Sequence, residues 1–286
     1  GFRGAGTDSL QLLDKAFDAV ELPLTVSFRC SRSVVLAARP FMPRIEAAPT
    51  APEGSVSREE TADGLLDEEL LLRYTLLPED VLLCRANAPL VSQAYTLIAE
   101  GIGCRMLGRS LGTALVSLVM KAKAADLPTL LSTLTEDLRV RRALNEADGE
   151  EADDSAVEDL SDRISCIRVV ADNLPAEQRS VEGLLRALKE LFEDRKGVVT
   201  LSSIHKAKGL EWERVFVLNE GLISRQAREA EDTSWRAQEE RNLQYVARTR
   251  AKHTLVLVRQ ARRKRKYDQE KDRERERKYN QEKDRE

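Results

Sequence analysis

The 286-residue sequence lacks long apolar runs, paired cysteines and a large content of aromatic residues. No apolar segment approaches the ~20 residues that a membrane-spanning helix needs, and the first residues carry no signal-peptide pattern. The four cysteines are scattered without a CxxC pair, which argues against a disulfide framework or a zinc site. These features predict an intracellular protein without a membrane partner, cytoplasmic or nucleoid-associated, or nuclear in a eukaryote.

Charged residues make up 33% of the chain, and they are distributed unevenly although the net charge is only -3. Every charged residue between Glu146 and Asp162 is acidic, whereas Arg262 to Lys266 are all basic. The segment KYDQEKDRE at 266–274 returns as KYNQEKDRE at 278–286 and holds almost no apolar residues. We therefore expect a solvated helix or a disordered arm at 261–286, whose basic cluster could alternatively bind nucleic acid or act as a localisation signal.

Strand-like and helical segments alternate along the chain, which predicts an α/β fold with a parallel sheet flanked by helices. The expected strands are 22–29, 80–85, 103–107, 198–204, 214–219 and 253–258. The expected helices follow Asp8, Ser31 and Asn87, occupy four stretches between 113 and 193, and end with one at 235–249. The four stretches form a helical insertion into the sheet, and residues 46–63, rich in Pro, Ser and Glu, form a connector.

The segment SSIHKAKGLEW, residues 202–212, joins two predicted strands and combines a hydroxyl, an imidazole, a glycine and a carboxylate. Its strand delivers Ser203 and His205 to the carboxyl end of the sheet, where open α/β sheets bind ligands. Both side chains can hold phosphate oxygens, Gly209 permits a close turn, and Glu211 could accept a hydrogen bond from a ribose hydroxyl. A polar junction between strand and turn, without a ligand, is the simpler interpretation of this segment on its own.

Two further segments combine cations with an apolar pattern. QEERNLQYVARTRAK, residues 238–252, forms an amphipathic helix with cations at its C-terminal end. These charges suit the helix dipole, or one arginine stabilises charge on a transferring phosphoryl group. In LPLTVSFRCSRSVV, residues 22–35, Phe28 could stack on a base and Arg29 could reach a phosphate. An arginine at a strand end is also a common surface salt-bridge partner.

In this order and register, the segments together resemble the C-terminal motifs of the UvrD/Rep-type superfamily 1 DNA helicases. GFRGAG at the start resembles the end of the third motif, TVSFRCS the fourth, VLLCRANAPL the Arg-x-Asn-Ala element after it, SSIHKAKGLEW the fifth and EERNLQYVARTRAK the sixth. The sequence departs from the family pattern where Ser27 replaces Asn, Cys30 replaces Ser and Arg248 replaces an apolar residue. The resemblance covers about residues 1–260.

This resemblance implies that the chain carries the second RecA-like motor domain of a P-loop NTPase fold. The first part of that domain would be residues 1–112, and its remainder would be residues 197–260. The helical insertion at 113–196 would take the place of the family's second accessory domain in a reduced form. Residues 261–286 would be a charged tail outside the domain.

The resemblance also implies roles for individual residues. Arg29 and Arg250 would contact the γ-phosphate of ATP as catalytic residues, with Arg250 as the arginine finger. Phe28 would stack near the adenine, Gly209 would contact the nucleotide, and Glu211 would meet the ribose. Magnesium ligands would come from an N-terminal RecA-like domain. Single-stranded DNA, or its junction with a duplex, would be held by Phe2, Arg3, Arg85, Asn87, Ser203 and His205.

A complete ATPase needs a P-loop and an acid for magnesium, and the chain contains no Gly-Lys pair. LLDEELLL at 65–72 imitates the acidic motif, but its place along the chain and its helix-like apolar spacing argue against that role. Because the chain begins within the third motif, we expect part of an ATP-dependent 3′–5′ helicase or translocase, a fragment or a split product, that cannot hydrolyse ATP alone. The alternatives are a non-catalytic single-strand-binding or regulatory remnant and, less consistent with the strands, a helical interaction protein.

Overall fold

A computed structural model of the chain describes residues 22–147, 154–193, 198–222 and 235–261, with a few more positions between 12 and 20. Most of the helix expected after Asp8 lies outside the described residues, and so do Phe2, Arg3 and the charged tail. Among the residues that are described, no helix is both long enough and apolar enough to cross a membrane.

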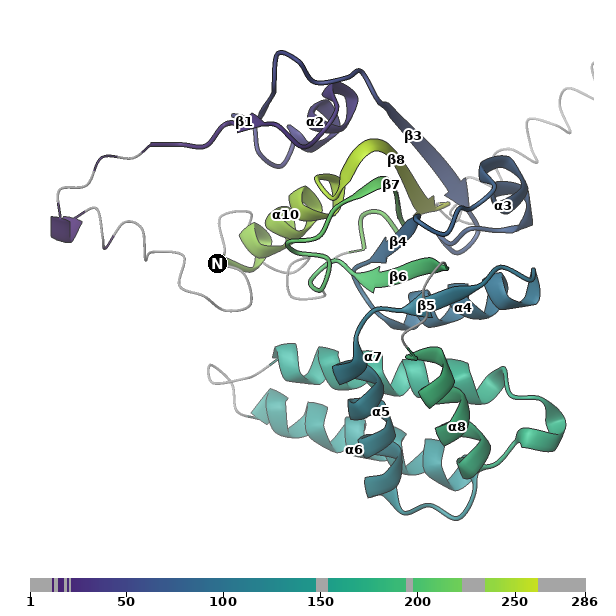
Figure 1. The fold of residues 1–286 in the computed structure, drawn as a ribbon. Coiled ribbons are helices and arrows are strands. Elements are labelled where there is room, and N and C mark those ends of the chain that lie inside the picture. Colours follow the sequence, from purple (N-terminus) through teal and green to yellow (C-terminus); the bar gives the residue numbers. More distant parts are fainter. Residues whose placement is uncertain are drawn as a thin grey trace, which may run out of the picture.

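Six parallel strands form the main sheet, in the order β3-β8-β7-β4-β6-β5 (Figure 1). The strands are β3 (Ser55–Thr61), β4 (Val81–Cys84), β5 (Cys104–Met106), β6 (Val199–Ser203), β7 (Trp212–Val217) and β8 (Ala251–Gln260). Every residue of β4 and β6 is buried, as expected for parallel strands covered on both faces. The prediction of a parallel α/β sheet flanked by helices is confirmed, and the architecture is consistent with a RecA-like fold.

Helices cover both faces of the sheet. The helices that do so are α2 (Arg32–Ala38), α3 (Glu68–Tyr74), α4 (Ala88–Ala99) and α10 (Trp235–Arg248). On one face, α2 and α10 share an apolar core with Leu83 and Val217, and on the other, α3 and α4 share one with Leu82 and Phe216. Successive residues of a strand point to opposite faces, so the central strands serve both cores.

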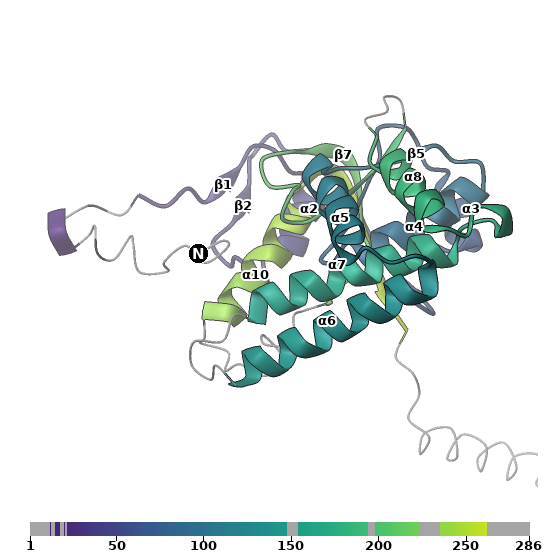
Figure 2. The ribbon, with the colours of Figure 1, turned by 90° about the horizontal axis from the view of Figure 1, so that it is seen from below.

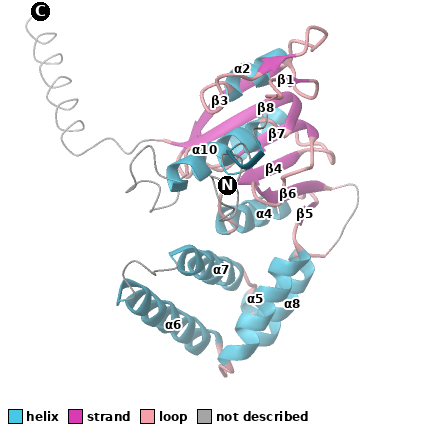
Figure 3. Ribbon diagram, turned by 90° about the vertical axis from the view of Figure 1, so that its left-hand side faces the viewer, coloured by secondary structure: helices cyan, strands magenta, loops and turns pink. Residues whose placement is uncertain are grey.

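Four longer helices lie between β5 and β6 and form a block beyond the β5 edge of the sheet (Figures 1 and 3). The elements of the block are α5 (Arg109–Ala122), α6 (Leu127–Ala147), α7 (Asp154–Asp172), the short 3₁₀ helix η2 (Ala176–Gln178) and α8 (Val181–Leu191). Figure 2 shows α6 and α7 lying side by side. Gly112 lets α5 approach the end of α8, since a Cβ there would lie 2.8 Å from the Phe192 side chain. The four predicted helical stretches are thereby confirmed.

The connector predicted at residues 46–63 is wrong. Residues 55–61 form β3, which pairs along its whole length with β8. β3 lies at the edge of the sheet, and its side chains are mostly polar or charged, which protects an edge from pairing with other chains. Because a loop has a similar composition, the sequence alone does not distinguish this strand from a connector.

The strand predicted at residues 22–29 is much shorter in the structure. Only β1 (Val26–Ser27) is paired, and it forms a separate two-stranded parallel sheet with β2 (Glu46–Ala47). The side chains of Leu22 and Leu24 are exposed. The apolar alternation of residues 22–29 therefore predicted a longer strand than the structure has, because no described part of the fold covers the side chains of Leu22 and Leu24.

Two helix caps test the local predictions from the sequence. Asp67 precedes α3 and accepts a hydrogen bond from the main-chain nitrogen of Leu70 (3.0 Å), so the acids of LLDEELLL start a helix, as their spacing predicted. Ser31 precedes α2 at the predicted cap position, but its hydroxyl does not cap the helix. It donates instead to the carbonyl oxygen of His253 (3.3 Å) and so ties α2 to β8.

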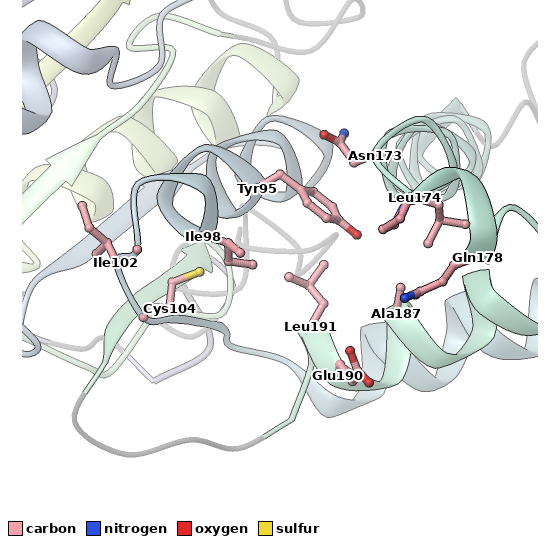
Figure 4. A pocket seen from close by; sticks show the side chains of 13 residues that line it. Tyr95, Ile98, Ile102, Cys104, Asn173, Leu174, Gln178, Ala187, Glu190 and Leu191 are labelled. Carbon is pink, nitrogen blue, oxygen red and sulfur yellow. The ribbon is translucent and has the colours of Figure 1, made fainter.

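A cavity of about 450 Å³ lies between α4, the start of β5 and the helices α7 and α8 (Figure 4). Its wall is mixed: apolar side chains such as Ile98 and Leu191 alternate with the polar groups of Tyr95, Asn173, Gln178 and Glu190. Burial, together with the charge of Glu190, raises the pKa of Tyr95. The residues predicted to contact nucleotide or DNA do not line this cavity.

All four cysteines are free thiols and all are buried. Burial raises the pKa of Cys84 to about 12 and also raises the pKa values of Cys30 and Cys166. Because the thiolate is the reactive form, we expect none of the four thiols to react with an aromatic disulfide reagent until the chain unfolds. Counting reactive thiols along a urea gradient, beside helical circular dichroism, measures this. A thiol that reacts well before the helices unfold would contradict the prediction.

Candidate nucleotide and DNA contact site

Three segments that are far apart in the sequence meet at the end of the sheet where the parallel strands β7 and β8 begin. This end, which carries the predicted nucleotide contacts, is called the nucleotide edge below. One segment follows β1, one precedes β7, and one links α10 to β8. Hydrogen bonds join these segments directly, so their side chains lie close together. The joining bonds are Ser31 N to Lys252 O (2.7 Å), Trp212 N to Arg250 O (2.9 Å) and Cys30 Sγ to Thr249 O (3.6 Å).

Arg29 and Glu211 form an ion pair across this junction, although 182 residues separate them. Nε of Arg29 donates to Oε2 of Glu211, and Nζ of Lys252 lies 3.3 Å from Oε1 of the same carboxylate. The hydrogen bond from Arg29, followed by that from Lys252, holds the pKa of Glu211 below its usual value. Each of the three side chains is more than a third exposed, so a ligand can reach them.

Arg250 lies near Arg29, but only 7% of its surface is exposed. Its guanidinium donates to Leu210 O (2.8 Å), Val246 O (3.1 Å) and Thr249 Oγ1 (3.3 Å). Burial lowers the pKa of Arg250, and the positive charge of Arg29 adds to this effect. Two neighbouring guanidinium groups repel each other, and an anion between them would relieve the repulsion. The pair is therefore suited to phosphate.

Phe28 and Gly209, the other two predicted nucleotide contacts, are open to solvent. The side chain of Phe28 is 85% exposed, which leaves a face available for stacking. Gly209 has φ +91°, and no atom lies within 4 Å of the position that a Cβ would take. Another residue would be strained there, while a ligand could approach the glycine backbone closely.

The predicted DNA contacts in the described residues lie at the opposite end of the sheet, where the parallel strands end. This end is called the DNA edge below. β4 ends at Cys84 and β6 ends at Ser203, and these two residues pair in register. Ser203 is buried, and its carbonyl oxygen accepts hydrogen bonds from the main-chain nitrogens of Lys206 (3.0 Å) and Ala207 (3.1 Å). The chain therefore turns sharply after β6 and leaves His205 half-buried at this edge.

Arg85 and Asn87, which follow β4, both contact carboxylates. Arg85 donates to Glu240 on α10 (3.0 and 3.1 Å), and Glu158 on α7 lies 4.0 Å away. Asp162 on α7 accepts a hydrogen bond from the side-chain amide of Asn87 (2.7 Å) and others from two main-chain N–H groups at the start of α4. These contacts hold the end of β4 against α7 and α10, and the DNA contacts of Arg85 and Asn87 stay a prediction.

Two segments connect the nucleotide edge with the DNA edge. Residues 204–211 run from the end of β6 to the start of β7, and because the strands are parallel they must pass from one edge to the other. Helix α10 carries Glu240, which contacts Arg85, and leads into Arg250. Both segments therefore reach both groups of predicted contacts.

Lys252, Glu240 and Asp162 take part in these contacts and were not predicted. Lys252 and Glu240 belong to the segment that resembles the sixth motif, but the spacing of that segment does not reveal their partners. Asp162 ends the acidic run, which indicated only a charged loop. Its contact with Asn87 joins residues 75 positions apart and has no signal in the sequence.

Arg248, which replaces an apolar residue of the family pattern, is buried on the α2 face of the sheet. Its guanidinium donates to Glu220 Oε1 (2.5 Å) and Gln244 O (3.0 Å) and lies 4.3 Å from the ring centre of Phe41. Burial lowers the pKa of Arg248, and its Nε is buried without a hydrogen-bond partner, so the ion pair and the aromatic face compensate for only part of the lost hydration. The substitution is accommodated by polar partners rather than by apolar packing.

The edge that carries Arg29 and Arg250 fits a nucleoside triphosphate in part. Its cations suit phosphate oxygens, Glu211 suits a hydroxyl donor, and Phe28 offers a face to a base. Within the described residues, no group of three or more carboxylate, histidine or cysteine side chains could hold a metal ion. The phosphate contacts of this edge stay a prediction.

One comparison identifies a family. Residues 131–262 match the family model of the UvrD-like helicase C-terminal domain, and this stretch includes β6, β7, β8 and α10 with the segments that resemble the fifth and sixth motifs. No curated protein matches the chain. This match confirms the resemblance inferred from the motifs: residues 131–262 are a UvrD-like helicase C-terminal domain, which supports the C-terminal portion of a UvrD/Rep-type helicase.

Proposed function

We propose that this chain is the C-terminal part of an ATP-dependent 3′–5′ DNA helicase or translocase, which couples ATP hydrolysis to movement along single-stranded DNA and to duplex unwinding. The family of residues 131–262 supports a helicase in general, and the resemblance of the motifs supports the polarity. The observation that carries the proposal is the meeting of Arg29, Glu211 and Arg250 at one edge of the sheet, on segments that hydrogen bonds join.

A first RecA-like domain would complete the ATP site, either in the same polypeptide or as a separate chain. It would supply the P-loop and the magnesium ligands, since this sequence has no Gly-Lys pair. Leu22, Leu24 and Phe28 are exposed apolar residues shortly before Arg29, and they offer that domain a surface to cover. From this side, Arg29 and Arg250 would contact the γ-phosphate.

Binding of ATP would draw the two domains together because Arg29 and Arg250 gain an anionic partner between them. Hydrolysis would remove the γ-phosphate and release the contact. Residues 204–211 and helix α10 would carry the resulting shift to the opposite edge, because each reaches from one edge to the other. Repeated closure and release would move a DNA strand in steps.

Single-stranded DNA, and its junction with a duplex, would cross the sheet where β5 and β6 end. Cationic residues gather there: Arg109 begins α5, and Nζ of Lys206 lies 3.5 Å from the hydroxyl of Ser110 near the start of the same helix. Together with Ser203 and His205, they would contact phosphates without reading the base sequence. Affinity for DNA should then fall as salt rises, because phosphate contacts release bound counterions.

Fluorescence anisotropy with a labelled single-stranded oligothymidylate tests this DNA contact. We expect salt-dependent binding by the chain, weakened about threefold to tenfold by Lys206→Met at low salt because one phosphate contact is lost. Lys121→Met is the matched control, since this exposed lysine lies in the last turn of α5. A chain that binds no single-stranded DNA, or equal affinities of the two variants, would contradict the DNA contact.

The second candidate function is a non-catalytic DNA-binding or regulatory module, favoured by the missing Gly-Lys pair. Arg29, Glu211 and Arg250 favour the helicase, because a binding module has no need of γ-phosphate ligands. Addition of the first RecA-like domain separates the two: a helicase gains DNA-stimulated ATP turnover, and a regulatory remnant does not. DNA-stimulated turnover by this chain alone, abolished by Arg250→Ala, would show instead that its ATP site is complete.

A further inference from the structure

Lys252 has no part in the proposed function so far, yet the fold directs it to the nucleotide edge. At the start of β8, two residues of this strand face a single residue of β7, which makes a β-bulge. The pairs on either side of the bulge are Trp212↔Ala251 and Arg214↔Thr254. A bulge changes the direction of a side chain, and here Lys252 reaches Glu211, the residue just before β7.

The carboxylate of Glu211 has a cation on each oxygen. Arg29 donates to Oε2, and Lys252 lies 3.3 Å from Oε1. The two cations are held differently, because Arg29 lies in an irregular segment after β1, whereas Lys252 lies within β8 and also contacts Glu213 (3.5 Å). Glu211 raises the pKa of Lys252, so the lysine stays charged in this arrangement.

A phosphate group at this edge would compete with Glu211 for Arg29. A guanidinium can bind phosphate through two parallel hydrogen bonds, which an ammonium group cannot do. The exposed ion pair with Glu211 is weak, and the nearby charge of Arg250 attracts the same anion. Arg29 is therefore the cation that leaves, and its departure makes Oε2 of Glu211 available.

A glutamate that loses one partner needs another group to stay in place, because its side chain has three rotatable bonds. We propose that Lys252 is a positioning residue of the nucleotide site. It holds Oε1 of Glu211 while Arg29 turns to the γ-phosphate, so that Oε2 can accept a hydrogen bond from a ribose hydroxyl. The inference rests on the proposed function, because it requires a nucleoside triphosphate at this edge.

A titration of the full chain with the magnesium salts of ATP and of 2′,3′-dideoxy-ATP tests the inference. NMR follows the amide signals of residues 209–213 and detects affinities in the millimolar range. We expect the wild-type chain to bind ATP about threefold to tenfold more tightly than the dideoxy nucleotide, because one hydrogen bond to ribose is lost. Lys252→Met should weaken ATP by a similar factor and leave the affinity for dideoxy-ATP unchanged. Lys252→Arg should retain part of the difference.

Lys121→Met removes an exposed lysine elsewhere and should keep the wild-type difference between the nucleotides. A purely structural effect of Lys252→Met would weaken both nucleotides equally. Equal weakening, or an unchanged difference, therefore overturns the role of Lys252 while the nucleotide contact stands. A wild-type chain that binds neither nucleotide overturns the proposed nucleotide contact itself, and one that binds both equally overturns the contact between Glu211 and ribose.

Discussion

Replacing Arg250 by alanine should lower DNA-stimulated ATP turnover about 10³-fold or more in an enzyme that combines this chain with a P-loop domain. An arginine that reaches the γ-phosphate from a second domain stabilises the charge of the transferring phosphoryl group, and alanine removes that charge. The substitution also removes the hydrogen bonds to Leu210 O and Val246 O, so the segment before Glu211 loses an anchor. We expect kcat to fall more than KM rises, because the contact matters most in the transition state.

Two further variants make this prediction specific. Arg250→Lys keeps the charge but not the planar fork of donors, so most of the loss should remain. Arg259→Ala is the matched control. Arg259 lies near the end of β8, the strand that Arg250 precedes, but it pairs with Glu60 at the surface, so turnover should stay within about twofold. Steady-state turnover with single-stranded DNA measures the effect, and circular dichroism verifies folding. A folded Arg250→Ala enzyme with turnover within about tenfold of wild type would exclude the arginine-finger role.

Segments with a strong apolar pattern could be predicted because they pack against other apolar residues along their length. β4 and β6 are buried throughout, so their apolar runs indicate strands without knowledge of their partners. The four helices of the insertion follow from their periodicity in the same way. β3 could not be predicted, since polar side chains suit an exposed edge strand and a loop equally, and only the neighbouring β8 decides between them.

The candidate site shows a similar limit. Motif order predicted that Arg29, Glu211 and Arg250 belong together, and the structure brings them to one edge, while their roles as nucleotide ligands stay predictions. The sequence could not show that Glu211 pairs with Arg29 or that Arg250 is buried. These properties depend on hydrogen bonds between distant segments, such as those of Arg29 and Glu211, which 182 residues separate, and a single sequence has no local signal for such contacts.

Loss of the Asp80 carboxylate should destabilise the fold strongly. Its side chain is only 3% exposed and accepts hydrogen bonds from Arg214 Nε (2.8 Å), Arg214 Nη2 (2.5 Å) and the main-chain nitrogen of Leu77 (2.6 Å). Arg214 also donates to the carbonyl oxygens of Tyr74 and Thr75 (both 3.1 Å), so the pair joins the start of β7 to the end of α3. The hydrogen bond to Asp80 raises the pKa of Arg214.

Asp80→Ala should lower the free energy of unfolding by about 3–5 kcal/mol, because it leaves a guanidinium of low exposure without its counter-ion. Urea unfolding followed by circular dichroism measures this change. Asp159→Ala is the control, since Asp159 pairs with Arg163 on the exposed side of α7 and should cost less than about 1 kcal/mol. Replacing both partners, as Asp80→Leu with Arg214→Met, should recover part of the loss, because no unpaired charge then remains. A loss below about 1 kcal/mol for Asp80→Ala would mean that water solvates Arg214 well enough to replace the carboxylate, and the pair would then not hold β7 to α3.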